Sequence, residues 1–453
     1  MVETGDERMG ISEGLGASFH ETGLSAMMGD PLHMRGVAGG GWESSDLRVE
    51  ALSHALRGWH LDVVVSGSIA AVESIRFIRM LRRFGAEVTP WLTAGGSQFV
   101  TPMALSWAAA REVRSCFEGN ASHIALGDAC IVAPASANFL SSVALGLTST
   151  PATALVASYL GVNKPVIMLP TMHESLKKSP AIGANLERLK TFGVEWLAAR
   201  LEEGKEKFPD PETTANAVCH LLNRHRRGGI AVFVTMGTTR GFIDEVRYVS
   251  NYSSGKLGSL IAEELYRQGY QTDVISGPCS FKPRNASQLI PVSTHDDMDS
   301  AVKQSVRCGA LGGIFAASVL DFVPETTVAG KLPSKDYPQL TVHLKRTEKI
   351  ISGIHLQAKV GFKLEVGLTA ERMNELARTY IERYGLTMMV VNDLRDVGES
   401  QHRAYVFEVD TDETGAKSIG RGVEIVGKMP LAQRIVRHMI TFLNRPEEPL
   451  GIS

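Results

Sequence analysis

The densest group of residues suited to chemistry lies in one stretch, residues 235–265, which reads TMGTTRGFIDEVRYVSNYSSGKLGSLIAEEL. A predicted strand ends at Gly237, and a predicted helix begins at Leu257. Just before that helix stand Ser253, Ser254, Gly255 and Lys256. Hydroxyls and backbone amides at the start of a helix suit a phosphate, and the lysine adds positive charge. The stretch therefore predicts an anion site, although Lys256 alone could equally be a solvated surface lysine.

The spacing of this stretch excludes one common kind of phosphate site. A Walker loop needs four residues between its first glycine and its Gly-Lys pair, and residues 235–265 do not provide them. Upstream of the turn the loop gathers further hydroxyls and charges, namely Thr238, Thr239, Arg240, Asp244 and Arg247. An ordinary solvated turn does not need so many small and charged residues, so the anion is expected to bind in another manner.

A second strand-to-helix turn reads GSIAAVES, residues 67–74, and places Gly67 and Ser68 where a phosphate could approach the backbone. It lacks the second and third glycines of a dinucleotide fingerprint. By itself it is better explained as an ordinary tight turn. The missing glycines argue against a nicotinamide-dependent dehydrogenase, which remains a third alternative that a flavin absorbance spectrum would exclude.

Polar residues also follow a predicted strand at IVAPASAN, where Pro134 to Asn138 come at the strand's carboxyl end. Open α/β sheets bind ligands at that edge. His123 precedes this strand, and His173 follows the next one. An imidazole can transfer protons near neutral pH, so both histidines are candidates for acid–base chemistry or substrate binding. A hydrogen-bonded structural histidine is the alternative for His123.

The elements that must position these residues alternate between strands and helices. Apolar runs of strand length occur at 61–67, 86–93, 128–136 and 164–170, with a helical pattern at 68–85 and further strand–helix units at 154–161 and 193–199. After a basic break at 221–229 the rhythm restarts at 230–237, 259–269, 270–277, 312–322 and 387–394. This alternation predicts α/β architecture with two doubly wound, parallel-sheet, Rossmann-like domains. The predicted divisions are a weakly ordered extension (1–45), a first domain (46–226) and a second domain (227–453).

Composition restricts the class of protein. The 453 residues include 44 glycines and carry a net charge of −2, which gives no basic surplus for nucleic acid. The five cysteines show no CxxC and no metal-ligand spacing, which favours a reducing compartment. No apolar run approaches the roughly 20 residues that span a bilayer. We expect a cytoplasmic protein that acts on small molecules, without nucleic-acid or membrane partners.

The stretch at 235–265 resembles the phosphopantothenate–cysteine ligases, whose signature reads approximately T-x-G-x-T-x-x-x-(I/L)-D-x-V-R-x-(I/V)-x-N-x-S-S-G-K-x-G. The resemblance continues in order through FAASVLDFVP, GKLPS, VGFKLE and VVNDL, over residues 230–440. It implies that Asn251 stabilises an acyl-nucleotide intermediate and that Lys331 neutralises charge on the nucleotide phosphates. It also implies a phosphate cradle at Ser253, Ser254, Gly255 and Lys256, with Asp321, Phe362, Lys363 and Asn392 around the nucleotide.

Residues 61–218 resemble the flavin-containing cysteine decarboxylases, most clearly at His-Ile followed by Pro-Ala-Ser-Ala-Asn. The resemblance implies the decarboxylase half of a bifunctional coenzyme A enzyme of archaeal-like type, with His123 as the base. Gly67, Ser68 and Thr93 would hold the FMN phosphate or ribityl chain, and Ser136 and Asn138 would border the flavin ring. His173 replaces an asparagine expected to bind the substrate carboxylate. The expected flap cysteine is absent from LEEGKEKFPD, residues 201–210.

These resemblances imply FMN, Mg²⁺ and CTP as cofactors and co-substrate, with ATP as an alternative nucleotide and the metal ligands unassigned. The expected substrates are 4′-phosphopantothenate and L-cysteine, joined first and then decarboxylated to 4′-phosphopantetheine. The same families imply a homo-oligomer based on trimers and reaching a dodecamer. Because the flap cysteine is missing, an alternative keeps only the ligase active and makes the first half a flavin-binding scaffold or regulatory module.

Overall fold

The computed structural model describes residues 45–444 except 125, 204, 334, 336–337, 397–401 and 412–416. The chain divides into two compact units, residues 1–48 and residues 49–453. Of the predicted extension 1–45, only its last residue is described; it begins the short 3-10 helix η1, Ser45–Leu47. Both α/β halves lie in the second unit.

The first half is built on a parallel five-stranded sheet with strand order β2-β1-β3-β4-β5. Its strands are β1 (His60–Val65), β2 (Glu87–Leu92), β3 (Ala129–Ala135), β4 (Val166–Pro170) and β5 (Glu195–Trp196). Every residue of β3 is buried, as expected for a central strand covered on both faces. The strand order is that of the flavodoxin-like doubly wound fold, in which the order reverses between β1 and β3 and ligands bind at that point.

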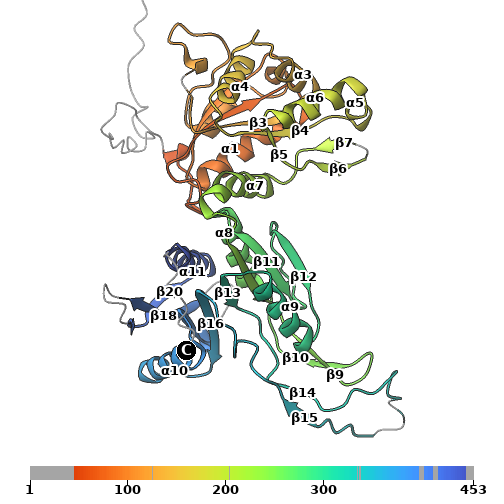
Figure 1. Cartoon of the computed structure of the whole chain (residues 1–453), viewed down its shortest axis with the longest axis vertical. Helices are drawn as coiled ribbons and strands as arrows, with labels where there is room; N and C mark the ends of the chain where they lie inside the picture. Colours follow the sequence, from red (N-terminus) through yellow and green to blue (C-terminus); the bar gives the residue numbers. More distant parts are fainter. Residues whose placement is uncertain are drawn as a thin grey trace, which may run out of the picture. The chain divides into compact units, whose positions relative to one another are not determined.

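Helices cover both faces of this sheet (Figure 1). One apolar cluster joins the sheet to α1 (Ser74–Arg83), α2 (Pro102–Ala109) and α7 (Pro211–Asn223). The opposite cluster joins it to α3 (Ala137–Ala144), α4 (Pro151–Gly161) and α6 (Pro180–Thr191). Short elements complete the half: η2 (Ile69–Glu73), η3 (Gly96–Gln98), η4 (Ser122–Ile124), α5 (Glu174–Lys177), β6 (Arg200–Glu202), β7 (Lys205–Lys207) and η5 (Arg224–Arg227). Together, the two clusters complete a doubly wound fold.

The second half has a nine-stranded sheet whose parallel part follows the order β12-β11-β8-β13-β16-β17. The strands are β8 (Ala231–Met236), β11 (Gln271–Ser276), β12 (Gln288–Pro291), β13 (Gly312–Phe315), β16 (Ala358–Glu365) and β17 (Met388–Asp393). In chain order this is 3-2-1-4-5-6, the arrangement of nucleotide-binding sheets. Three antiparallel strands extend it beyond β17: β18 (Arg403–Thr411), β19 (Lys417–Ile419) and β20 (Val423–Val426). The predicted α/β class is confirmed, and this antiparallel edge is an addition to the predicted parallel sheet.

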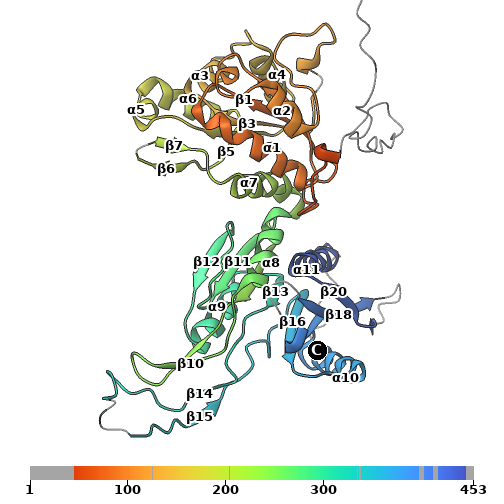
Figure 2. The ribbon, with the colours of Figure 1, turned by 180° about the vertical axis from the view of Figure 1, so that it is seen from behind.

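Helices again cover both faces. The helices α8 (Lys256–Arg267) and α11 (Lys428–Leu443) share one apolar cluster with the sheet. On the other face lie α9 (His295–Arg307) and α10 (Ala370–Tyr384). Two short ribbons, β9–β10 (Arg240–Phe242 and Tyr248–Ser250) and β14–β15 (Phe322–Pro324 and Leu344–Arg346), extend away from this sheet in both views (Figures 1 and 2). Among the described helices, none has the length and apolar character needed to cross a membrane.

Candidate functional site

The predicted phosphate cradle forms the turn that opens α8 at the carboxyl edge of β8. Gly255 occupies the N-cap position with φ +76°, a conformation that favours glycine, and no side chain caps the helix. The Ser253 hydroxyl accepts from the Gly255 N–H at 3.3 Å, and the Ser254 hydroxyl accepts from the Lys256 N–H at 3.4 Å. These hydrogen bonds are long, so a phosphate could replace the hydroxyls as acceptor.

A loop after β11 supports this turn, and the sequence reading did not assign it a role. The Phe281 N–H donates to the Ser254 carbonyl at 3.0 Å, and the Lys256 ammonium lies 5.3 Å from the centre of the Phe281 ring. A Cβ on Gly255 would lie 2.8 Å from Cβ of Cys279. The signal that could have revealed this loop is the SGP sequence at the end of β11, because neighbouring parallel strands deliver their carboxyl ends to one edge.

Asp244 organises the loop between β9 and β10. Its buried carboxylate accepts from the backbone N–H groups of Val246 at 2.8 Å and Arg247 at 2.6 Å, and pairs with the Arg247 guanidinium at 2.5 Å. It also accepts from the Leu332 N–H at 3.1 Å. Burial raises the pKa of Asp244, but these hydrogen bonds outweigh it and hold the pKa at about 2. The carboxylate is therefore ionised at neutral pH.

Lys331 lies between two residues that this loop anchors. The Glu245 N–H donates to the Gly330 carbonyl at 3.1 Å, and the Glu245 carboxylate accepts from the Gly330 N–H at 3.0 Å. The Arg247 guanidinium donates to the Leu332 carbonyl at 3.1 Å. The Lys331 side chain itself is exposed and has no ion pair or hydrogen bond to any described residue. The backbone of this segment is thus fixed while its ammonium group is free to reach a ligand.

Asn251 lies at the other end of the same ribbon. It follows β10, and its amide donates to the Val319 carbonyl at 3.1 Å. Three residues of extended chain, 248–250, separate it from Arg247, so the two residues are about 13 Å apart at the usual strand rise. The hollow between β18 and α11 contains neither Asn251 nor Lys331. Their convergence on one ligand remains a prediction that requires Lys331 to reach along the ribbon.

The predicted nucleotide residues divide between the two faces of the sheet. Phe362 packs into the apolar cluster under α8 and α11. Met388 and Val390 of β17 belong to the same cluster, and Asn392 is the next alternate residue of that strand, so it lies on the same face. Lys363 turns to the α10 face, where it pairs with Glu365 at 3.1 Å and lies 5.9 Å from the Tyr380 ring. Burial lowers the pKa of Lys363, but Glu365, Tyr380 and Asp321 outweigh it and raise the pKa. Asp321 itself is paired with Lys349.

His402 is a polar residue beside Asn392 that the sequence reading missed. It immediately precedes β18, and its ring nitrogen Nε2 lies 3.1 Å from the Asn392 amide nitrogen. Both side chains are buried, with 6% and 8% of their surface exposed. Only the antiparallel β17–β18 pairing brings these residues together, so the sequence spacing gave little indication of the contact.

In the first half, the predicted flavin residues gather where the strand order reverses. The Ser66 hydroxyl at the end of β1 donates to the Pro134 carbonyl at 2.9 Å and accepts from the Ser136 N–H at 2.8 Å. A Cβ on Gly67 would lie 2.9 Å from the Gly95 carbonyl carbon, so the two loops meet there backbone to backbone.

Ser68 and Thr93 fix the same two loops. Ser68 caps η2, and its hydroxyl accepts from the Thr171 hydroxyl at 3.2 Å. The Thr93 hydroxyl accepts from the Gly96 N–H at 3.1 Å. Ser136 caps α3 by accepting from the Phe139 N–H at 3.4 Å, and Asn138 is exposed in the first turn of that helix. The predicted phosphate and flavin residues therefore share one edge of the sheet.

The two predicted histidines differ in their surroundings. His123 packs edge-to-face on Phe117, and its buried Nδ1 has no hydrogen-bond partner among the described residues. His173 is exposed and caps α5, where its Nδ1 accepts from the Ser175 N–H at 3.2 Å. That bond places the ring proton on Nε2, which leaves a donor suited to a carboxylate.

The hairpin β6–β7 occupies the sequence position of the cysteine-bearing flap. The Glu206 N–H donates to the Met172 carbonyl at 3.1 Å, and the Glu206 carboxylate pairs with Lys177 of α5. These contacts connect the hairpin to the segment that carries His173. The hairpin is therefore tied to a predicted substrate-binding segment without any cysteine.

Comparison with known proteins decides the family. Residues 228–442 match the model of the DNA/pantothenate metabolism flavoprotein C-terminal domain, and residues 49–223 match the Flavoprotein model. A coenzyme A biosynthesis bifunctional protein CoaBC from Thermococcus kodakarensis is 33% identical over 395 residues, which cover 84% of this chain and 95% of that protein. This chain belongs to the CoaBC family.

Other CoaBC proteins agree with this assignment. That of Methanocaldococcus jannaschii is 30% identical over 81% of this chain and 93% of its own length, and that of Escherichia coli is 29% identical over 75% and 87%. The predicted family and its archaeal-like character are confirmed. The chain is accordingly a bifunctional ligase and carboxy-lyase of coenzyme A biosynthesis, with a flavoprotein half.

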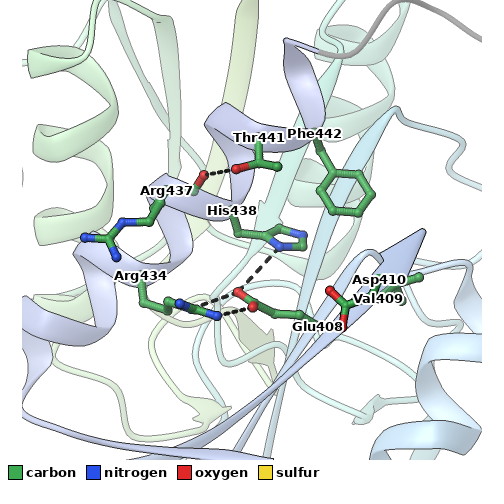
Figure 3. A pocket seen from close by; sticks show the side chains of 8 residues that line it. All are labelled: Glu408, Val409, Asp410, Arg434, Arg437, His438, Thr441 and Phe442. Carbon is green, nitrogen blue, oxygen red and sulfur yellow. Dashed lines mark hydrogen bonds and ion pairs between the residues drawn. The ribbon is translucent and has the colours of Figure 1, made fainter. Parts of the chain in front are cut away.

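One small hollow lies away from the residues assigned to CoaBC chemistry. It encloses about 130 Å³ between β18 and α11 and is lined by Glu408, Val409, Asp410, Arg434, Arg437, His438, Thr441 and Phe442 (Figure 3). Inside it Glu408 pairs with Arg434, and a carboxylate oxygen of Glu408 lies 3.6 Å from His438 Nδ1. Glu408 pairs in register with Met388, the first residue of β17, which places the hollow at the opposite edge from Asn392.

No group of three or more His, Cys, Asp or Glu side chains suited to a metal occurs among the described residues.

Proposed function

We propose that the second half joins 4′-phosphopantothenate to L-cysteine at the expense of CTP. The observation that carries this proposal is the turn Ser253–Lys256 at the start of α8, whose amides, hydroxyls and ammonium group suit a phosphate at the carboxyl edge of the sheet. Phe281 and Gly255 fix the backbone of that turn, so its amides are oriented before a ligand binds.

The reaction requires activation of a carboxylate. A carboxylate oxygen of phosphopantothenate attacks the α-phosphorus of CTP, and pyrophosphate leaves to give an acyl cytidylate. The amine of cysteine then attacks the acyl carbon, the amide forms, and CMP leaves with the bonding electrons while the amine loses a proton. Mg²⁺ bound to the triphosphate offsets its charge.

Two side chains are assigned to the charged stages of this reaction. The Asn251 amide, held by the Val319 carbonyl, stabilises the acyl cytidylate. The Lys331 ammonium neutralises negative charge on the phosphates, and the contacts of Asp244, Glu245 and Arg247 with the flanking backbone hold its segment. Electrostatic stabilisation of this kind contributes much of the rate in phosphoryl and nucleotidyl transfer.

For the first half we propose decarboxylation of the ligation product with FMN. The residues fit a phosphorylated flavin: the Gly67–Gly95 contact admits no side chain, and the turn beside it opens η2 at the point where the strand order reverses. Gly67, Ser68 and Thr93 would hold the phosphate or ribityl chain, and Ser136 and Asn138 would border the ring. When bound, the flavin reversibly accepts electrons from the cysteinyl carbon, which makes loss of CO₂ easy.

The protein's own groups would manage protons and orientation in that step. His123 has a buried ring nitrogen without a partner among the described residues, which suits a base awaiting a ligand. The Nε2 proton of His173 would hold the substrate carboxylate. The exposed side chains of Ile69 and Met103, 72% and 83% accessible, suit contacts between copies in the trimer-based homo-oligomer that we propose.

The alternative, a flavin-loaded scaffold with ligation alone, is favoured by one observation: the hairpin β6–β7 carries no cysteine. A single experiment decides between them. The purified protein is incubated with phosphopantothenate, cysteine, Mg²⁺ and either CTP or ATP, and phosphopantothenoylcysteine, nucleoside monophosphate and CO₂ are quantified. With CTP we expect CMP and CO₂ but little phosphopantothenoylcysteine, because the decarboxylase consumes it. Ligation without CO₂ release would leave the scaffold, and absence of ligation with both nucleotides would refute the proposed ligase.

A further inference from the structure

Asn392 and His402 form a buried polar pair with two unused hydrogen-bonding atoms. Their side chains meet through the Asn392 amide nitrogen and His402 Nε2 at 3.1 Å. Neither Asn392 Oδ1 nor His402 Nδ1 has a partner among the described residues, although both atoms are buried. A buried polar atom without a partner destabilises the folded protein. Two such atoms on residues that contact each other indicate a group that binds there.

The chemistry of that group follows from the hydrogen bond within the pair. Burial lowers the pKa of His402, and the nearby positive charge of Lys428 lowers it further, so the ring is neutral at physiological pH. With Nε2 accepting from Asn392, the ring proton resides on Nδ1. The pair therefore offers one donor, His402 Nδ1–H, and one acceptor, Asn392 Oδ1, to a bound group. Phosphate oxygens only accept hydrogen bonds, so a phosphate cannot satisfy the asparagine.

The pair lies on the same face and at the same edge as the phosphate turn. Asn392 and Phe362 are near the carboxyl ends of β17 and β16 on the face covered by α8 and α11. Helix α8 begins at that edge, because it returns from β8 to the parallel strand β11. Helix α11 begins there too, because β20 runs parallel to β17, and the Gly427 N–H at its start donates to the His402 carbonyl at 2.7 Å.

We propose that His402 and Asn392 bind the nucleoside part of the nucleotide whose phosphates occupy the Ser253–Lys256 turn. This inference rests on the proposed ligase function. Asn392 Oδ1 accepts from an N–H or O–H of the nucleoside, and His402 Nδ1–H donates to a separate acceptor. A nucleoside carries donors and acceptors on both its base and its ribose, so it can serve both atoms. His402 is thereby a binding residue for the nucleotide as well as the group that orients Asn392.

The test compares CTP with inorganic tripolyphosphate, which carries the phosphates without the nucleoside. Binding is measured by calorimetry for the unaltered protein and for His402→Leu and His402→Gln. His402→Leu removes both ring nitrogens, and we expect the dissociation constant of CTP to rise about tenfold, or about 1.4 kcal/mol. His402→Gln keeps a partner for Asn392 but loses the Nδ1 donor, so a smaller rise is expected. Tripolyphosphate binding should change less than about twofold in both.

A matched control is His438→Gln, which alters another buried histidine, 6% exposed, at the opposite edge of the same half. It should leave both dissociation constants unchanged. The same comparison is made with 2′-deoxy-CTP and with UTP. If His402→Leu no longer raises the dissociation constant of 2′-deoxy-CTP, the contact is to the ribose; if it no longer raises that of UTP, the contact is to the base. Either result supports the proposal. Equal weakening of CTP and tripolyphosphate, or no weakening of either, would overturn it.

The unaltered protein provides a test that needs no variant. Hydrogen exchange at the imidazole C2 position of His402 should slow when CTP is bound and remain unchanged with tripolyphosphate. Unchanged exchange with CTP would contradict the proposal even if the variants fail to fold. Ligation by the unaltered protein is assayed in parallel, so that loss of the ligase function itself is distinguished from failure of this inference.

Discussion

The carboxylate of Asp244 accepts a hydrogen bond from the backbone N–H of Leu332, 3.1 Å away, and so fixes the residue that follows Lys331. Asp244 is buried and also holds three groups of its own loop, which makes it the link between the β9–β10 ribbon and the lysine segment. We expect Asp244→Ala to lower kcat of ligation at least tenfold by releasing Lys331, with a smaller change in KM for CTP. An unchanged kcat, measured by CMP release, would contradict this link.

The same carboxylate should make the second half sensitive to acid. The pKa of Asp244 is about 2 in the folded protein and near its ordinary value of 3.8 when unfolded. As the pH falls, the unfolded chain takes up this proton first, so the stabilisation present above about pH 4 is lost between pH 4 and 2. Thermal melting across this range should show a shallower decline for Asp244→Asn than for the unaltered protein. Parallel declines would argue against this assignment.

Gly255→Ala should disrupt the phosphate turn for two reasons. The position has φ +76°, and a Cβ there would lie 2.8 Å from Cβ of Cys279. Gly385→Ala is the matched control, because it has φ +60° but meets no atom within 4 Å. The control should lose only the conformational cost of about 1 kcal/mol and keep its ligase activity. We expect Gly255→Ala to lose more stability and at least tenfold in ligation. Equal behaviour of the two variants would show that the Cys279 contact is unimportant.

Gly67→Ala should prevent flavin retention without affecting ligation, because its Cβ would lie 2.9 Å from the Gly95 carbonyl carbon. Gly183→Ala, within α6 and with open space around it, serves as the control. The ratio of flavin absorbance to protein absorbance after purification measures the effect. An absorbance ratio for Gly67→Ala equal to that of the control would show that the Gly67–Gly95 contact is not part of the flavin site.

Asp62 anchors the buried side of the first sheet. Its carboxylate accepts from Trp91 Nε1 at 2.9 Å, from the Tyr159 hydroxyl at 2.5 Å and from the Gly127 N–H at 3.2 Å. Burial and the neighbouring Asp62 charge raise the pKa of Tyr159, which keeps its hydroxyl protonated as a donor. Tyr159→Phe should lower the free energy of unfolding of this half by about 1–3 kcal/mol, followed through the temperature of flavin release. Trp91 fluorescence reports the same transition.

Much of the fold and part of the candidate site could be predicted from the sequence, because local patterns determine them. Apolar runs that alternate with helical periodicity identified most strands and helices, and the Ser-Ser-Gly-Lys turn lies at the helix start that its residue types favour. Residues 154–161 lie within helix α4, which begins at Pro151 behind a capping box made by Thr150 and Thr153.

Other features depend on tertiary contacts that spacing does not reveal. Lys363 and Phe362 were grouped as neighbours of one nucleotide, but adjacent strand residues point to opposite faces, and this alternation was available from the sequence. His402 reaches Asn392 only through the pairing of β17 with β18. Phe281 reaches Lys256 only because the loop after β11 packs on the turn before α8. The antiparallel pairing of β18 with β17 also lacked a local signal, because a strand sequence does not show the direction in which the strand pairs.

Ligation turnover by Lys331→Gln, compared with Lys335→Gln as a neighbouring exposed lysine, tests the central account most directly. Both variants lose one positive charge from the same segment, but only Lys331 is flanked by the residues that Asp244 and Glu245 hold. We predict that kcat falls at least 100-fold, or about 2.7 kcal/mol, for Lys331→Gln, while Lys335→Gln stays within about twofold of the unaltered protein. Equal turnover by the two variants would contradict the account.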